Sequence, residues 1–185
     1  MAAEDTLDLL ERALAQTCAI ISCVRPDQAS LETPCTDWDV RTLVNHTVYG
    51  LQLYTAIVTG GEPPSSDADL IGSDWTNAYR SASDSHLAAW RRRGTAGTLQ
   101  LRMGERPAAW VTNAVLEDQT VHGWDLARAT GQSTDLDPEV GQAVLDWLRE
   151  NIGPFRGRVF GPEVPVSEDA PLYDRLAGFC GRRPN

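Results

Sequence analysis

Helical periodicity constrains the fold of this sequence most, because apolar side chains recur every three or four residues along several segments. An amphipathic helix must bury its apolar stripe against another element, so several such segments in one chain favour a helical bundle. The periodicity predicts helices over residues 5–24, 37–58, 73–92, 107–130, 138–151 and 172–181. The predicted fold class is therefore all-α, a four-helix bundle with short additional helices in its C-terminal part.

Local signals set the boundaries of these helices. Thr36 and Asp39 resemble a capping box before the second helix, and Gly60-Gly61 provide its exit. Residues 98–103 alternate as a strand would, but no partner of comparable strength is visible. We therefore expect this segment to be an extended connector and not part of a sheet.

The length of 185 residues fits a single domain that spans residues 1–185. No stretch approaches the roughly 20 continuous apolar residues that a membrane span needs. The first residues, MAAEDTLDLLERAL, carry acids where a signal peptide would carry a basic region. We expect a cytoplasmic protein with no membrane partner.

The charge balance excludes several function classes. A formal net charge of −10 argues against a nucleic-acid partner, since that affinity requires clustered positive charge. We expect the one basic cluster, Arg91-Arg92-Arg93, to complement the dipole at a helix C-terminus. All 16 basic residues are arginine, so chemistry that depends on a lysine Schiff base or a P-loop lysine is excluded.

The fourth predicted helix carries polar residues inside its apolar stripe. Asp118 and His122 are one turn apart and lie within the apolar stripe that Val111, Val115, Leu126 and Ala129 form on the helical wheel. Burying a carboxylate on such a face costs several kcal/mol unless a partner compensates its charge. A divalent cation would compensate it fully and would keep both side chains deprotonated.

The second predicted helix repeats this anomaly. His46 lies on its core-facing stripe, and Gly50 one turn later leaves room beside the imidazole. Two imidazoles and one carboxylate match a catalytic metal site with an open position, because a structural zinc site is closed by four protein ligands. We expect one divalent metal, zinc by preference, although nickel, iron and manganese also suit this donor set.

Other residues are weaker candidates for the same pocket. His86 is the remaining histidine, and an inward orientation would let it supplement the ligands. Asp125 lies at the edge of the stripe, where it would hydrogen-bond a ligand imidazole or pair with an arginine. Tyr49 would either point its hydroxyl into the pocket or pack in the core. Cys35 lies in the loop before the second helix, near His46 in sequence, and is a weaker candidate for a reactive thiol.

Two long segments, TPCTDWDVRTLVNH and DQTVHGWDLARATGQ, carry a family resemblance. With FGPEVPV and DRLAGFCGRRP, they resemble the actinobacterial DinB-like proteins of the mycothiol-dependent maleylpyruvate isomerase N-terminal-domain type. The resemblance implies a DinB-like four-helix bundle with a divalent metal, usually zinc, bound by three side chains. The ligands that it implies here are His46, Asp118 and His122.

The sequence departs from that family in two respects. The acidic ligand of the mycothiol-dependent isomerases is glutamate, whereas this chain has Asp118. Those isomerases also carry a sterol-carrier-like C-terminal domain, whereas a short tail follows the bundle here. The resemblance thus implies metal binding and leaves the substrate open.

Our leading functional hypothesis is a metal-dependent enzyme of the mycothiol-dependent isomerase or thiol S-transferase type. A low-molecular-weight thiol, by analogy mycothiol, would attack a small electrophilic substrate as its thiolate. One alternative is a non-catalytic protein that binds a metal or a small ligand and lacks an accessible pocket. Another keeps the bundle but makes the polar trio structural, without a metal. A homodimer is compatible with the acidic surface.

Overall fold

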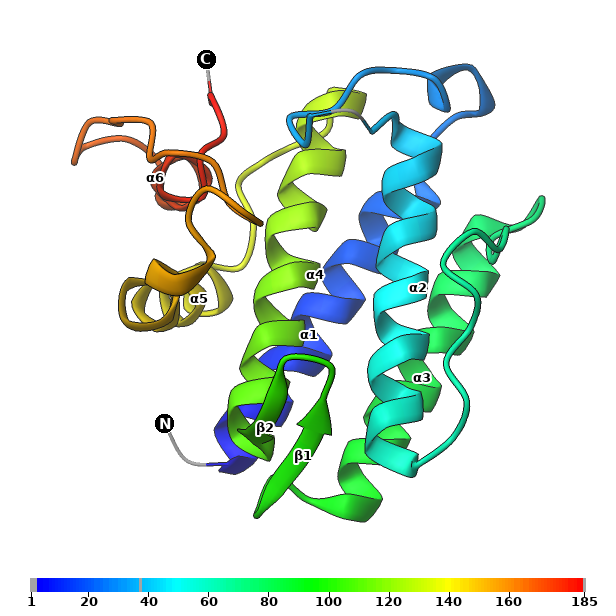
Figure 1. The fold of residues 1–185 in the computed structure, drawn as a ribbon. Coiled ribbons are helices and arrows are strands. Elements are labelled where there is room, and N and C mark those ends of the chain that lie inside the picture. Colours follow the sequence, from blue (N-terminus) through cyan, green and yellow to red (C-terminus); the bar gives the residue numbers. More distant parts are fainter. Residues whose placement is uncertain (1–2, 37, 185) are drawn as a thin grey trace.

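Four long helices form an antiparallel bundle (Figure 1). The computed structural model describes residues 3–36 and 38–184. Helix α1 packs against α3 and α4, and α2 packs against the same two helices from the other side. The prediction of an all-α bundle is confirmed. The bundle helices are α1 (Ala3–Ser22), α2 (Val40–Thr59), α3 (Trp75–Arg93) and α4 (Ala108–Thr130).

The N-terminal boundary of α2 differs from the prediction. Its N-cap is Asp39, whose carboxylate accepts a hydrogen bond from the backbone N–H of Thr42 at 2.7 Å. The predicted capping box that begins at Thr36 is therefore wrong, because an aspartate three residues later supplies the cap by itself. The expected first helical residue, Asp37, lies outside the described residues. The predicted exit is confirmed, since Gly60 caps α2 with a φ of +73°.

The segment predicted as a connector is a strand of a small hairpin. Strand β1 (Thr98–Leu101) pairs antiparallel with β2 (Gly104–Pro107), and Leu101 lies opposite Gly104. The prediction missed this sheet because the second strand, GERP, has no apolar alternation of its own. Leu99 and Leu101 are buried. The strand pairing is therefore stabilised by contact with the bundle, and not by the β propensity of the strands.

Helix α4 occupies the centre of the structure, because the C-terminal elements cover the side that faces away from the bundle (Figure 1). Both α5 and α6 pack against α4, and α5 also contacts α1. As a result α4 is buried on nearly all sides and not along one stripe. The remaining elements are α5 (Pro138–Asn151), α6 (Leu172–Phe179) and the 3₁₀ turns Pro26–Gln28 and Gly153–Phe155.

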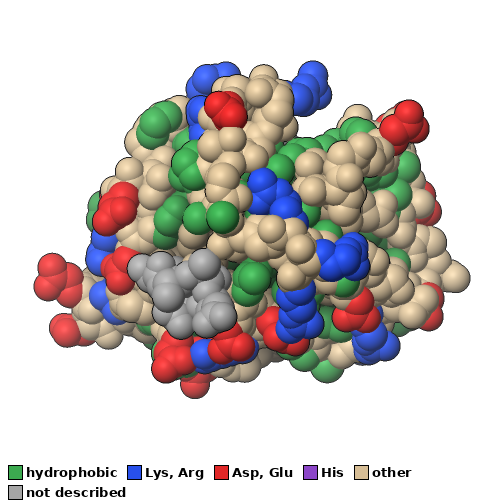
Figure 2. Space-filling view, turned by 90° about the horizontal axis from the view of Figure 1, so that it is seen from below, with side chains coloured by type: hydrophobic (Ala, Val, Ile, Leu, Met, Phe, Trp, Pro, Cys, Tyr) green, Lys and Arg blue, Asp and Glu red, His purple; other side chains and the backbone are tan. Residues whose placement is uncertain are grey.

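The predicted role of the arginine cluster at the end of α3 is confirmed. Arg91, Arg92 and Arg93 occupy the last turn, and Arg93 donates to the carbonyl oxygens of Gly94 and Thr98, each at 2.9 Å. Figure 2 shows the molecule from below, where arginine and acidic side chains are interspersed over the described part of this face. Among the described residues, none of the helices combines the length and apolarity that crossing a bilayer requires.

His86 has a structural environment in the bundle. The indole N–H of Trp90 donates to His86 Nε2 at 3.0 Å, which leaves the proton on Nδ1. That nitrogen lies 3.0 Å from Thr55 Oγ1, whose own proton goes to the Leu51 carbonyl oxygen at 2.7 Å. Both ring nitrogens are therefore engaged, and burial lowers the pKa of His86 to about 4.

This burial predicts a pH dependence of stability. The unfolded chain binds a proton at His86 below about pH 6.5, whereas the folded chain binds it only near pH 4. The contribution to stability is therefore complete above pH 6.5 and is lost as the pH falls toward 4, by on the order of 3 kcal/mol. We expect the His86 ring signals in NMR spectra to stay constant from pH 7.5 to 5. A midpoint near 6.5 in the folded protein would contradict this assignment.

Candidate metal site between α2 and α4

The structure brings the three predicted metal ligands together. His46 Nε2 lies 3.3 Å from Asp118 Oδ1, and His122 Nε2 lies 3.5 Å from the same oxygen. The three donor atoms all lie within 4.8 Å of one another. His46 comes from α2, while Asp118 and His122 share one face of α4 one turn apart. The antiparallel packing of two helices therefore creates the cluster.

The spacing of these donors fits a tetrahedral cation. Charge-assisted N–H···O hydrogen bonds are usually about 2.7–2.9 Å long, so the contacts of Asp118 with His46 and His122 are long for direct pairing. Two ligand atoms that each lie about 2.0–2.1 Å from a tetrahedral zinc ion are roughly 3.3 Å apart. The observed separations of 3.3 and 3.5 Å are close to that value. The donor set and its spacing therefore suit a divalent metal.

Asp125 controls the orientation of the His122 imidazole. It is fully buried, and its Oδ2 lies 3.0 Å from His122 Nδ1. Burial by itself would raise the pKa of Asp125, but the hydrogen bond with His122 and the charge of Arg182 bring it below its ordinary value. An ionised carboxylate only accepts, so His122 Nδ1 carries a proton, and Nε2 is the ring nitrogen that faces Asp118. Ligand histidines in metal sites usually show this arrangement.

The carboxylate of Asp118 is also held from behind. Its Oδ2 accepts a hydrogen bond from Gln119 Nε2 at 2.9 Å, and Tyr79 donates to Gln119 Oε1 at 2.7 Å. A Cβ atom at Gly50 would lie 3.4 Å from Asp118 Oδ2, at ordinary van der Waals distance, so Gly50 adjoins this carboxylate. Burial alone would raise the pKa of Asp118, but the hydrogen bond from His46 and the nearby His122 lower it.

A cavity of about 340 Å³ opens onto the three clustered side chains. The three clustered side chains form one part of the cavity wall, and the loop before α2 and the C-terminal segment form the rest. Trp38 covers the imidazoles, since its ring centroid lies 4.3 Å from that of His46 and 5.9 Å from that of His122. Besides Trp38 and the three clustered residues, the lining consists of Pro34, Cys35, Thr36, Glu117, Val159, Phe160, Gly161, Cys180, Gly181 and Arg182.

Glu117 is a cavity residue that the sequence analysis missed. The residue is 9% exposed, and the described part of the chain provides its side chain with no hydrogen bond or ion pair. Burial, followed by the neighbouring Asp118 charge, raises the pKa of Glu117 to about 8. On the helical wheel Glu117 lies about 140° from His122, so it belongs to the other side of α4. Only the C-terminal segment turns that side into a cavity wall.

Two of the weaker candidates lie outside the cluster. His86 is hydrogen-bonded inside the bundle, and Tyr49 is not among the residues that line the cavity. Tyr54, one turn after Gly50, is the tyrosine whose pKa the charge of the site affects. Burial and then the negative charge of Asp118 raise the pKa of Tyr54 to about 12.

Cys35 belongs to a second group of possible donors. Its sulfur lies within 4.8 Å of donor atoms of His122 and Asp125. However, both oxygens of Asp125 already accept hydrogen bonds, from His122 Nδ1 and from the Arg182 guanidinium. A cation there would have to displace the arginine. The cluster of His46, Asp118 and His122 is therefore the better candidate for a metal site.

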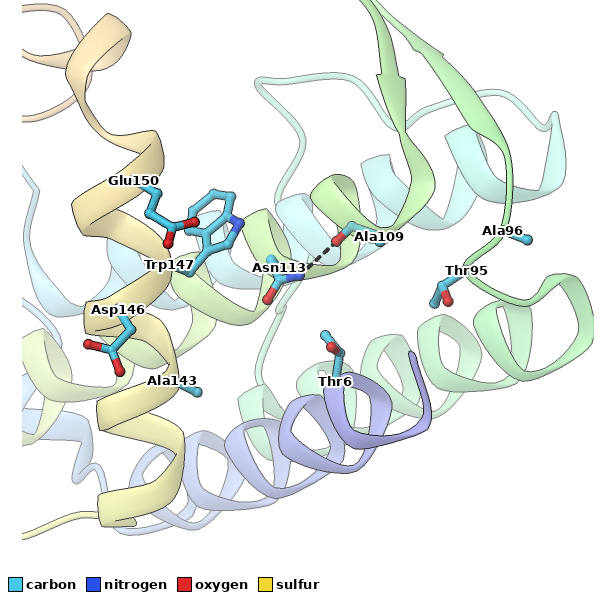
Figure 3. A pocket seen from close by; sticks show the side chains of 9 residues that line it. All are labelled: Thr6, Thr95, Ala96, Ala109, Asn113, Ala143, Asp146, Trp147 and Glu150. Carbon is cyan, nitrogen blue, oxygen red and sulfur yellow. Dashed lines mark hydrogen bonds between the residues drawn. The ribbon is translucent and has the colours of Figure 1, made fainter. Parts of the chain in front are cut away.

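A larger cavity of about 630 Å³ lies where the starts of α1 and α4 meet α5 (Figure 3). Two carboxylates, Asp146 and Glu150, border it, and Trp147 lies between them on α5. Its lining contains neither histidine nor cysteine, so it offers no comparable donor set. Chemistry therefore favours the smaller cavity. The other residues that line the larger one are Thr6, Thr95, Ala96, Ala109, Asn113 and Ala143.

Comparisons with known proteins agree with this fold. The chain is 35% identical over 182 residues to the uncharacterized protein Rv0738 of Mycobacterium tuberculosis strain H37Rv. The same identity is found with the uncharacterized protein MT0763 of strain CDC 1551 / Oshkosh. Each match covers 96% of this chain and 98% of the relative.

A solved structure shares the architecture. The crystal structure of the mycothiol-dependent maleylpyruvate isomerase superposes with a TM-score of 0.59 at 20% identity. The match covers 80% of this chain and 68% of the other. A sequence model described as the mycothiol maleylpyruvate isomerase N-terminal domain matches residues 10–127, a range that includes all three clustered side chains. The chain therefore belongs to the mycothiol maleylpyruvate isomerase N-terminal domain family.

Proposed function

We propose that this chain is a metal-dependent enzyme that uses a low-molecular-weight thiol to act on a small electrophilic substrate. His46, Asp118 and His122 would hold one divalent metal, zinc by preference. The observation that carries the proposal is the spacing of 3.3 and 3.5 Å between Asp118 Oδ1 and the two imidazole nitrogens, which fits zinc better than direct hydrogen bonds. By analogy with the solved relative, the thiol would be mycothiol and the reaction an isomerisation or an S-transfer.

The surroundings of the cluster support a reactive site. When bound, such a metal lowers the pKa of a thiol and so makes the thiolate available at neutral pH. The protein's own part is to bind the metal and the thiol and to exclude water from the site. Trp38 shields the two imidazoles on one side, and Gln119 holds the carboxylate of Asp118 on the other. A structural zinc site would be closed by a fourth protein ligand, whereas a cavity opens onto these three residues.

The same cavity argues against the main alternative. A protein that only stores or senses a metal would be expected to enclose it, whereas this cavity of about 340 Å³ is within the usual size range for small-molecule sites. A purely structural trio is also disfavoured, because Asp118 would then make two long contacts where short charge-assisted bonds are possible. The catalytic reading is therefore the one we propose.

Metal binding can be tested with a substitution that preserves shape. Asp118→Asn removes the charge of the candidate ligand, so we expect zinc affinity to fall by more than about 100-fold. This loss would exceed that caused by removing a group that only orients a ligand. Competition with a chromophoric chelator measures the affinity, and elemental analysis measures the metal content. Asp84→Asn, at an exposed position on α3, is the matched control and should bind zinc like the parent protein. Equal affinity of the Asp118 and Asp84 variants would refute the proposed ligand set.

Catalysis requires a separate measurement. Zinc-loaded protein, incubated with mycothiol and a panel of small electrophiles, should accelerate thiol consumption or isomerisation of a cis-enone-type acid. We expect the rate to fall to background after chelation and to return with added zinc. His46→Ala should lose the activity, because it removes one ligand from α2. Tight zinc binding without turnover of any thiol would instead favour the non-catalytic alternative.

A further inference from the structure

A chain of charged contacts joins the C-terminal segment to the candidate metal site. Arg182 Nη2 donates to Asp125 Oδ2 at 2.9 Å, and Arg182 Nε donates to Asp125 Oδ1 at 3.2 Å. Asp125 in turn accepts the Nδ1 proton of His122 at 3.0 Å. The side chain of Asp125 is fully buried, and those of Arg182 and His122 are each 10% exposed. Arg182 is thus connected to the candidate metal site through the carboxylate of Asp125.

The backbone holds Arg182 in place for this contact. The N–H of Arg182 donates to the Ala177 carbonyl oxygen and the N–H of Gly181 donates to that of Gly178, both at 2.9 Å. These two bonds form a Schellman motif at the end of α6, with Gly181 at a φ of +88°. A Cβ atom at Gly181 would also lie 3.0 Å from the Cα of Gly161, so the turn is packed as well as bonded.

The charges in this chain depend on one another. A buried carboxylate needs a compensating charge, and the bidentate guanidinium supplies it for Asp125. With Arg182 in place, Asp125 is ionised and only accepts hydrogen bonds, which keeps the His122 proton on Nδ1. Without the guanidinium, the Asp125 carboxylate would lose the two contacts that fix its plane, and the His122 ring would lose the fixed acceptor that orients it.

We propose that Arg182 is a positioning residue of the metal site, which acts through Asp125 to hold His122 in the tautomer and orientation that present Nε2 to the metal. The inference rests on the proposed function. It extends the site beyond residues 10–127, the range that matches the family, to a segment that closes over α4 from outside the bundle. Because such a coupling is reciprocal, metal binding should also strengthen the docking of the C-terminal segment.

The first experiment compares neighbouring arginines. Arg182→Met keeps most of the side-chain length but removes the charge, and we expect it to weaken zinc binding by about 10- to 100-fold. Arg183→Met is the matched control, because Arg183 is exposed, and its zinc affinity should stay within about twofold of the parent value. Chelator competition on protein with native circular dichroism gives both constants. A folded Arg182→Met protein with parental affinity would overturn the proposal.

The second experiment reads the tautomer without metal. In ¹⁵N spectra of the metal-free protein, His122 should show a protonated Nδ1 and an unprotonated Nε2, and the Arg182→Met exchange should change this pattern. Arg182→Lys, which restores the charge but not the bidentate contact, should recover part of the pattern and part of the affinity. If Arg182→Met does not fold, Arg182→Lys supplies both readouts, and a parental pattern with parental affinity in that variant counts against the inference.

The two proposals fail separately. If the parent protein binds no zinc, the proposed function fails, and the tautomer still tests whether Arg182 positions His122. If the parent binds zinc but Arg182→Met differs from it only in thermal stability, the arginine merely anchors the C-terminal segment. In that case the positioning role is refuted while the proposed function stands.

Discussion

The rest of the structure depends on how α4 accommodates the ionised carboxylates of Asp118 and Asp125 inside the protein. Asp118 and Asp125 lie two turns apart on this helix, on either side of His122. Burial opposes the ionisation of each, and in each case specific partners reverse the effect, so that both pKa values are below normal. The partner of Asp125 is Arg182, whereas Asp118 has only imidazoles at long distance and an amide. That imbalance at Asp118 is what supports the proposed metal site.

The position of α4 explains why one helix carries so much of the chemistry. The bundle covers one side of α4, and the C-terminal elements cover the other. Side chains from both sides therefore reach the same cavity, Asp118 and His122 from the bundle side and Glu117 from the opposite side. A shorter bundle without the C-terminal cover would expose Asp125 and Glu117 to water, and neither would then be strongly perturbed.

Much of the fold could be predicted because its signals are local. Helical periodicity and caps such as Gly60 act within a few residues, and the bundle helices match their predicted ranges closely. The hairpin was not predicted, because the burial of Leu99 and Leu101 stabilises it and that burial depends on helices that are distant in the sequence. The capping box at Thr36 failed for a different reason, since Asp39 is itself an acceptable cap and its carboxylate accepts the Thr42 N–H.

For the candidate site, the sequence by itself determined which residues share a helical face. Asp118 and His122 converge because they are one turn apart, and His46 faces the core because its helix has one apolar stripe. Only the tertiary structure decided that these faces meet and that Arg182, 57 residues after Asp125 in the chain, compensates that carboxylate. The physical reason is that a buried charge selects its partner by proximity in space, and periodicity along one helix carries no information about a segment that returns from elsewhere.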